Sequence, residues 1–354
     1  MEEKAARRAN VVGVGLIGGS VALGLRERGW HVTGDDRDRA TLEVARELDV
    51  IDEVGFDKDA EITFIATPVG GVVEAVERAL AACPGVVTDV GSVKQEIAQA
   101  ISNPRFVAGH PMAGSEQHGV RGARPGLFSN ATWVITPTET TSDEAYTLVR
   151  QVVRSLGAEV VSMDPAMHDA AVARISHVPH LTAATMMVMA SGAGFDDEAV
   201  LRLAAGGFRD MTRIAAGHPA IWLDICEQNK GQIIGALDDL IAALHNTRDI
   251  VDRTDRADLS SLLTGARTAR VNLPSGIPSG LELCEVRVTM PDVPGAIAAL
   301  TTIAPEINIY DFEIAHSSEG GRGVAIMVLA LDDFPAFAAK LKAAGHRSSM
   351  RKLQ

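Results

Sequence analysis

The stretch Asn10–Ser20, which reads NVVGVGLIGGS, decides the fold of the first part of this chain. A short apolar run leads into glycines with the spacing G-x-G-x-x-G, namely Gly13, Gly15 and Gly18. The next residues, Ser20–Glu27, have the composition of a helix. Strand, glycine loop and helix in this order are typical of the Rossmann fold, which binds dinucleotides.

Each glycine has a physical role in binding a pyrophosphate. Gly13 makes the tight turn, Gly15 lets the phosphate approach the backbone, and Gly18 lets the helix pack closely on the strand. The N-terminus of the helix offers free N–H groups and partial positive charge to the phosphates, and Leu16 and Ile17 lie between the glycines just before it. We therefore expect these residues to bind the cofactor.

An acidic residue follows the second predicted strand, Trp30–Thr33. Asp36 lies 18 residues after the third glycine, where a carboxylate accepts hydrogen bonds from the ribose hydroxyls and repels the 2′-phosphate of NADP. We therefore expect NAD as cofactor. Two neighbours leave alternatives open, because Arg37 could pair with a 2′-phosphate and Asp35 could make the ribose contact. Asp36 could also be a turn or helix-capping residue.

The alternation of strands and helices continues as far as residue 163. The predicted strands are Ile62–Ala66, Val86–Asp89, Phe106–Ala108, Trp133–Thr136 and Glu159–Ser162, and the predicted helices are Val72–Ala82, Gln95–Ile101 and Asp143–Leu156. Ligands of open parallel sheets bind beyond the carboxyl ends of the strands. Thr67, Pro68, Ser92 and His110 follow such ends, so we expect them to share one sheet edge with the glycine loop.

The most informative of these strand ends is Gly109–Gly119, which reads GHPMAGSEQHG. His110 precedes a proline, which biases its backbone toward extended geometry. An imidazole held rigidly at a strand end is well suited to exchange a proton near neutral pH. The alternative is a loop histidine that makes only local hydrogen bonds.

Beyond Asp164 the pattern becomes helical. The helical segments are Ala166–Ser191, Asp196–Ala216, Pro219–Asp252 and Arg256–Arg270. Their apolar residues lie on several faces, more than one small helical layer can bury, so we expect a homodimer.

Polar candidates stand out on these apolar helices. His168, Ser176 and His180 recur at spacings of eight and four, and Pro179 is expected to kink the helix beside His180. Arg213 is a candidate for binding a substrate carboxylate. The alternatives are satisfied core histidines and a structural ion pair.

The last part of the chain reads as a separate small domain. The segment Asn272–Gly280 (NLPSGIPSG) has the composition of a linker. The elements after it are predicted as strand Leu283–Thr289, helix Gly295–Ala304, strands Ile307–Ala315 and Val324–Leu331, helix Pro335–Ala344 and a short final strand. The order βαββαβ is ferredoxin-like. Lacking a catalytic cluster, this domain is expected to bind or regulate.

Charge and cysteine usage exclude several classes of function. Lysine and arginine number 33 against 46 acidic residues, a net charge of −13, which argues against nucleic acid or an anionic membrane as partner. Cys83, Cys226 and Cys284 are isolated, so neither a disulfide framework nor a zinc or other metal site is expected. With no apolar signal segment or membrane span apparent in the sequence, we expect a cytoplasmic protein.

The motifs taken together resemble one family. The glycine loop, GSVK, GHPMAGSE, HD…SHVPH, FRDMTR and the segment around Trp222 resemble, in this order, the prephenate/arogenate dehydrogenases of tyrosine biosynthesis. The C-terminal part, with MPDVPGAI at its first strand-to-helix turn, resembles an ACT domain. The resemblance implies a Rossmann domain (1–163), an all-helical substrate and dimerisation domain (164–271), a linker (272–280) and an ACT-like regulatory domain (281–354).

The resemblance also implies a reaction and roles for residues. Such enzymes oxidise a cyclohexadiene by moving hydride from C4 to NAD while the 4-hydroxyl loses its proton and CO2 leaves. His110 would be the base, Ser92 would orient it or the hydroxyl, and Arg213 would bind a carboxylate. The substrate side would be lined by His168, Ser176, His180, Trp222, Ser115 and Glu116, and a tyrosine effector would bind at Asp292, Pro294, Gly295 and Asn308.

Other readings remain open from the sequence alone. A β-hydroxyacid-type dehydrogenase would need a catalytic lysine, for which Lys230 is the candidate, but it leaves GHPMAGSE unexplained. A dinucleotide sensor with an amino-acid-binding unit would bind cofactor without turnover. No residue distinguishes prephenate from arogenate, which differ in a keto against an amino group.

Overall fold

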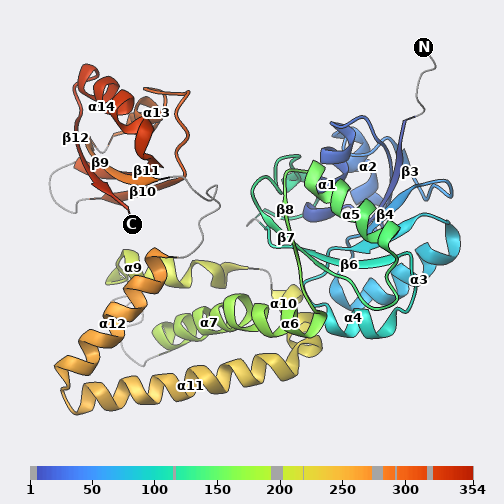
Figure 1. The fold of residues 1–354 in the computed structure, drawn as a ribbon, viewed down its shortest axis with the longest axis horizontal. Coiled ribbons are helices and arrows are strands. Elements are labelled where there is room, and N and C mark those ends of the chain that lie inside the picture. Colours follow the sequence, from blue (N-terminus) through green and yellow to red (C-terminus); the bar gives the residue numbers. More distant parts are fainter. Residues whose placement is uncertain are drawn as a thin grey trace. The chain divides into compact units, whose positions relative to one another are not determined.

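The computed structural model describes residues 6–114, 117–192, 202–217, 219–272, 282–291, 293–316 and 322–353. The chain divides into two compact units, Met1–Asp255 and Arg256–Gln354 (Figure 1). Among the described helices, none is long and apolar enough to cross a membrane. The domain boundaries given above stay predictions.

The first unit contains an eight-stranded sheet with the order β3-β2-β1-β4-β5-β6-β7-β8. The strands are β1 (Arg8–Val12), β2 (His31–Asp35), β3 (Glu53–Val54), β4 (Ile62–Ile65), β5 (Val86–Asp89), β6 (Phe106–Pro111), β7 (Thr132–Thr136) and β8 (Glu159–Ser162). Strands β1 to β6 pair in parallel, β7 is antiparallel to β6, and β8 is parallel to β7. The predicted Rossmann-type sheet is confirmed.

Helices cover both faces of this sheet. One face carries α1 (Leu16–Arg26), α2 (Arg39–Glu47) and α5 (Asp143–Ser155), and the other carries α3 (Val72–Ala82) and α4 (Gln95–Ala100). Helix α2 and strand β3 were not predicted from the sequence. The signal for α2 was available, because Asp38 accepts a hydrogen bond from the backbone N–H of Ala40 and so caps the helix.

The helical region of the first unit shares the core beneath α3 and α4. Its segments are α6 (Pro165–Val172), the π-helix η3 (Ala173–His177), α7 (Val178–Ser191), α9 (Gly206–Thr212), the 3₁₀ turn η4 (Arg213–Ala216), α10 (Pro219–Gln228) and α11 (Lys230–Asp252). Val178, Ile225 and Ile233 are buried in one cluster with Val72 and Ile97 of the nucleotide-binding side. This shared core fixes α7, α10 and the first part of α11 against α3 and α4, and beyond it α7 and α11 extend away together (Figure 1).

The expected kink at Pro179 takes the form of a π-helix immediately before it. Pro179 has no N–H to donate, and the residues before it, Ala173–His177, have the wider π-helical turn. The π-helix changes which side chains face inward: His177 is buried, whereas Ser176 is half-buried.

The second unit consists of α12 (Arg256–Val271) and a four-stranded antiparallel sheet with the order β10-β11-β9-β12. After α12 come β9 (Leu283–Pro291), α13 (Ala296–Thr301), β10 (Asp311–His316), β11 (Arg322–Ala330), the 3₁₀ turn η5 (Leu331–Asp333), α14 (Phe334–Ala343) and β12 (Arg347–Lys352). The predicted order βαββαβ is confirmed. Strand β10 begins four residues later than predicted, after the irregular segment that contains Asn308.

Candidate active site

The glycine loop has the geometry that close approach of a ligand requires. Gly13 has a φ of +92°, and a Cβ there would lie 2.5 Å from the carbonyl oxygen of Ala66. A Cβ on Gly18 would lie 1.9 Å from the carbonyl oxygen of Gly13. A Cβ on Gly15 would meet nothing within 4 Å. Gly13 and Gly18 are therefore required by packing, and Gly15 faces open space.

Helix α1 begins at this open space, four residues earlier than predicted. Gly15 is its N-cap and offers no side chain, and the first bond of the helix runs from the N–H of Gly19 to the carbonyl of Gly15. The N–H groups of Leu16, Ile17 and Gly18 thus have no acceptor within the helix. The loop and helix end fit a pyrophosphate, which needs both free donors and room beside the backbone.

Asp36 ties the glycine loop to the end of β2. One carboxylate oxygen accepts the N–H of Val14 at 2.8 Å, and the other accepts the N–H of Asp38 at 2.9 Å. A carboxylate has about four acceptor positions, so Asp36 retains capacity for the hydroxyls of a ribose. Arg37 is exposed.

A buried ion pair lies at the carboxyl end of β5. Lys94 and Asp89 are both 0% exposed and form a salt bridge. Asp89 also accepts the N–H groups of Gly91 and Gly109, and the ammonium of Lys94 donates to the carbonyl of Gly109 at 2.8 Å. Burial lowers the pKa of Lys94, and the charge of Asp89 opposes that shift. The pair fixes the backbone on which His110 stands.

Strand β6 is longer than the predicted Phe106–Ala108 and contains His110 rather than ending before it. Its parallel pairing with β5 stops at Val107, but antiparallel pairing with β7 continues and places His110 opposite Val134. A Cβ at Gly109 would lie 3.0 Å from the indole nitrogen of Trp133, which explains a glycine here. His110 therefore lies just beyond the parallel part of the sheet, on a rigid strand.

The side chain of His110 belongs to a hydrogen-bonded chain. Its Nδ1 lies 2.9 Å from Nε2 of His168, and Nδ1 of His168 lies 2.7 Å from Oδ1 of Asp169. Asp169 accepts the N–H of Lys94 at 2.8 Å and that of Gln95 at 2.9 Å. His168 and Asp169 are each 1% exposed.

A second group of aromatic side chains lies on α7 and α10. The ring of His180 stacks on Trp222, with centroids 3.6 Å apart and planes at 15°. The ring centroid of His177 lies 6.0 Å from that of the same indole, in an edge-to-face arrangement. Nδ1 of His177 lies 3.2 Å from the amide nitrogen of Asn229. Asn229 also donates to the carbonyl of Asp169 at 2.9 Å, which joins this group to the histidine chain.

The surroundings keep His110, His177 and His180 neutral. Burial holds the pKa of His110 well below its ordinary value, and the neighbouring His168, Lys94 and His177 lower it further. Burial lowers the pKa of His177 to about 4, against the opposing charge of Asp169, and burial also lowers the pKa of His180. A neutral His110 can accept a proton at physiological pH.

The remaining predicted residues lie at several places. Ser92 and Thr67 are half-buried at strand ends, Pro68 is exposed, and Arg213 is exposed in η4, which packs against α7. Ser115 and Glu116 lie outside the described residues. Lys230 is exposed at the start of α11.

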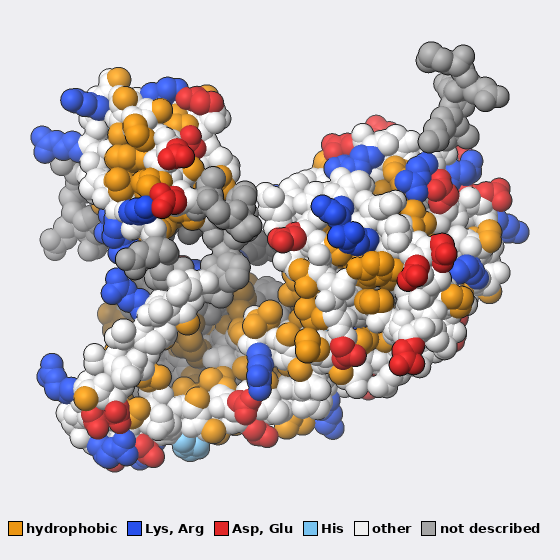
Figure 2. All heavy atoms as spheres, in the orientation of Figure 1, with side chains coloured by type: hydrophobic (Ala, Val, Ile, Leu, Met, Phe, Trp, Pro, Cys, Tyr) orange, Lys and Arg blue, Asp and Glu red, His pale blue; other side chains and the backbone are white. Residues whose placement is uncertain are grey.

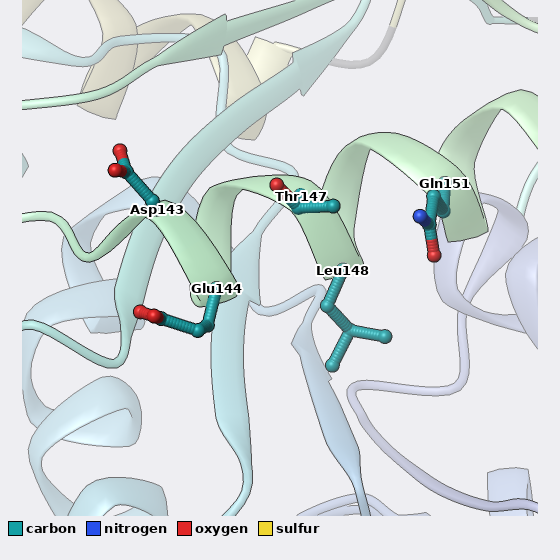
Figure 3. A pocket seen from close by; sticks show the side chains of 5 residues that line it. All are labelled: Asp143, Glu144, Thr147, Leu148 and Gln151. Carbon is teal, nitrogen blue, oxygen red and sulfur yellow. The ribbon is translucent and has the colours of Figure 1, made fainter.

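One surface depression lies apart from these groups (Figure 3). It is lined by Asp143, Glu144, Thr147, Leu148 and Gln151, all from one side of α5. Among the described residues no cluster of three His, Cys, Asp or Glu side chains is arranged to hold a metal ion.

Comparison with known proteins identifies the family. The family model "Prephenate dehydrogenase, nucleotide-binding domain" matches residues 21–162, and "Prephenate dehydrogenase, dimerization domain" matches residues 164–265. The prephenate dehydrogenase of Bacillus subtilis is 34% identical, with 91% of this chain and 92% of that protein covered. The chain belongs to the prephenate dehydrogenase family.

Solved structures agree with this assignment. Prephenate dehydrogenase from A. aeolicus, in complex with hydroxyphenyl propionate and NAD+, has a TM-score of 0.72 and 27% identity, covering 77% of this chain and all of that one. Arogenate dehydrogenase from Synechocystis has a TM-score of 0.66 and 34% identity, covering 74% of this chain and 98% of that one. The predicted family, the NAD-dependent dehydrogenase class and the NAD cofactor are confirmed.

Sequence reasoning missed several buried polar residues of this dehydrogenase site. They are Asp89, Lys94, Asp169, His177 and Asn229. Three of them stand inside motifs that carried the resemblance: Lys94 in GSVK, Asp169 beside His168, and His177 in SHVPH. The available signal was an ionisable residue within an apolar segment, which must be paired when it is buried.

We predict that Asp36→Ser lowers the preference for NAD over NADP. Loss of the carboxylate removes its repulsion of the 2′-phosphate and its charged hydrogen bonds to the ribose. The preference for NAD over NADP should therefore fall by about 10- to 100-fold. The measurement is the ratio of kcat/KM for NAD to that for NADP. Asp38→Ser is the matched control, because serine also caps α2, and its ratio should match the parent. An unchanged ratio in Asp36→Ser would exclude this role.

Proposed function

We propose that the chain oxidises prephenate to 4-hydroxyphenylpyruvate, with His110 as the base for the 4-hydroxyl. The observation that carries this proposal is a neutral histidine on a rigid strand, with one ring nitrogen engaged by buried His168. It stands beyond the parallel part of the sheet, at the edge that also bears the glycine loop and Ser92. Bound NAD supplies the hydride acceptor at this edge.

The chain's residues then need to remove a proton and hold anionic groups. His110 accepts the hydroxyl proton as hydride leaves the carbon that bears the hydroxyl. Loss of CO2 then makes the ring aromatic, and the phenolate oxygen takes the proton back to give the phenol of the product. Aromatisation supplies the driving force, so orientation and proton transfer are the enzyme's main tasks. Ser92, three residues beyond Asp89, is proposed to orient the hydroxyl.

The substrate carboxylates need cationic or polar partners. We assign this role to Arg213, whose guanidinium can bind a carboxylate through two parallel hydrogen bonds. Its segment η4 packs on α7. Gly217, which follows η4, lies so close to His180 that a Cβ placed on this glycine would be 3.3 Å from the imidazole ring. The stacked His180 and Trp222 would then form an aromatic wall for the substrate, with the half-buried Ser176 preceding them on η3.

We expect His110→Asn to retain NAD binding and to lower kcat by roughly 10²–10⁴-fold, the usual effect of losing an acid–base group. Asparagine offers hydrogen bonds but cannot take up the proton. The assay follows the absorbance of reduced cofactor with prephenate and, in parallel, arogenate. Turnover of neither substrate by the parent protein would refute the proposed reaction, and near-normal kcat in the variant would refute the role of His110.

The helical region is proposed to form a homodimer. Large apolar side chains remain exposed on it, including Val188 and Met189 of α7 at 70% and 68% and Leu244 of α11 at 56%. Figure 2 shows hydrophobic side chains at the surface of this region. Burial against a second copy would remove them from water, and the matching family model is described as a dimerization domain.

We predict a mass of twice the chain in sedimentation equilibrium. Replacing both Val188 and Met189 by lysine should shift the protein toward the monomer, because two charges would be buried without partners. Val54→Lys, on the far edge strand β3, is the control and should leave the dimer intact. A monomeric parent protein contradicts the proposal.

The C-terminal unit is proposed to be an ACT-like domain that binds tyrosine. Pro294 and Gly295 form the turn between β9 and α13, where Gly295 has a φ of +87° and caps the helix without a side chain. Free N–H groups at such a turn suit the carboxylate of an amino acid. Asn308 is exposed on the segment before β10, and Asp292 lies outside the described residues.

We expect tyrosine to inhibit the full chain several-fold, as for a typical coupling free energy of about 1–3 kcal/mol. A chain ending at Asn272 should stay active and lose this response. The expected activity is supported by the Synechocystis enzyme, since 74% of this chain covers 98% of that one. Full-length enzyme that ignores millimolar tyrosine, or equal inhibition of the shortened chain, contradicts a tyrosine sensor.

A cytoplasmic location is proposed as well. Cys83, Cys226 and Cys284 are all free thiols, and disulfide bonds are rare in the reducing cytoplasm. Fractionation of the source cells tests this location, which recovery of the activity outside the cytoplasm would contradict.

A further inference from the structure

We propose that Asp169 and His168 are positioning residues that fix the tautomer of His110, so that its Nε2 is unprotonated and available to the substrate hydroxyl. The assignment of that hydroxyl rests on the function proposed above. The tautomer itself is inferred from the hydrogen bonds that join Asp169, His168 and His110, and it can be tested without substrate.

Two backbone N–H groups hold the carboxylate of Asp169. Its Oδ1 accepts the backbone N–H of Lys94, and its Oδ2 accepts that of Gln95. Since each oxygen already faces a donor that cannot reverse its role, the carboxylate acts as an acceptor on both sides. The third partner, Nδ1 of His168 at 2.7 Å from Oδ1, must therefore donate a proton.

The position of the proton on His110 depends on that of the proton on His168. A neutral imidazole carries one proton, so a His168 protonated on Nδ1 presents an unprotonated Nε2. The atom 2.9 Å away is Nδ1 of His110, which must then be the donor. The proton of neutral His110 is thus on Nδ1, and its Nε2 carries the lone pair that a base needs.

Burial, His168, Lys94 and His177 keep the pKa of His110 well below its ordinary value, so this ring is neutral and carries a single proton. His168 is 1% exposed, and the ammonium of Lys94 lies on the same loop whose N–H groups bind Asp169. His177, which faces the group from η3, is held by Asn229. The charges packed around the rings are those of Asp89, Lys94 and Asp169, of which Asp89 and Lys94 neutralise each other.

Asparagine in place of Asp169 can reverse the hydrogen bonds from Asp169 to His110. When its oxygen accepts the N–H of Gln95, its NH2 group takes the place of Oδ1, which accepts from His168 in the parent, and donates to Nδ1 of His168 instead. His168 would then carry its proton on Nε2 and donate to His110, which moves the His110 proton to Nε2. In a related arrangement of carboxylate and histidine, this kind of change lowers kcat by about 10⁴-fold because the tautomer is wrong.

The direct test is nitrogen NMR of the full-length protein labelled with 15N-histidine, with His110→Asn used to assign the signals. The parent should show His110 protonated on Nδ1, and Asp169→Asn should move the proton to Nε2. A parent His110 protonated on Nε2 would overturn the proposal. This result does not depend on which substrate the enzyme uses, so it is separate from any failure of the proposed reaction.

Kinetics separate positioning from a structural role of Asp169. Asp169→Asn should lower kcat by roughly 10²–10⁴-fold with an unchanged Kd for NAD, and should cost nothing further in a His110→Asn background. An equal additional loss in that background would overturn the proposal. Asp164→Asn is the matched control, because asparagine retains the cap of the same helix and only the charge is lost.

A conservative variant provides rescue. In His168→Gln the side-chain oxygen can accept from Nδ1 of His110, so kcat should stay within about tenfold of the parent. His168→Phe has no acceptor and should fall as far as Asp169→Asn. Parent-like kcat in His168→Phe would overturn the proposal.

Discussion

The site depends on the buried ion pair between Lys94 and Asp89. Both charges are removed from water, a cost that only close pairing and further hydrogen bonds can offset. Those bonds run to Gly91 and to both the N–H and the carbonyl of Gly109. Removing one partner of such a pair typically costs about 3–5 kcal/mol, so the sheet edge beneath His110 is held strongly in one arrangement.

Local sequence signals predict the nucleotide-binding half well. Val72–Ala82, Val86–Asp89 and Glu159–Ser162 have the predicted boundaries, because apolar runs and the residues that end them are local features. The length of β6 could not be predicted in this way. It is set by pairing with β7, whose residues lie about 25 positions further along, and no pattern within β6 records that partner.

The site could be predicted only in part, for a similar reason. His110, His168, His180 and Trp222 were identified by residue type and motif, and the structure brings them together in two pairs. The link through Asp169 joins residues 75 positions apart, and only the fold reveals it. The inward position of His177 follows from the π-helix, whereas regular helical spacing had favoured Ser176.

The hydrogen-bonded chain also constrains how this family can evolve. His110 and Lys94 lie within the match to the nucleotide-binding domain, whereas His168 and Asp169 follow the point, near residue 163, where the second family match begins. A recombination event at that boundary would keep both sequence signatures yet divide the shared core and give His110 an unrelated neighbour. We therefore expect the two regions to be inherited together.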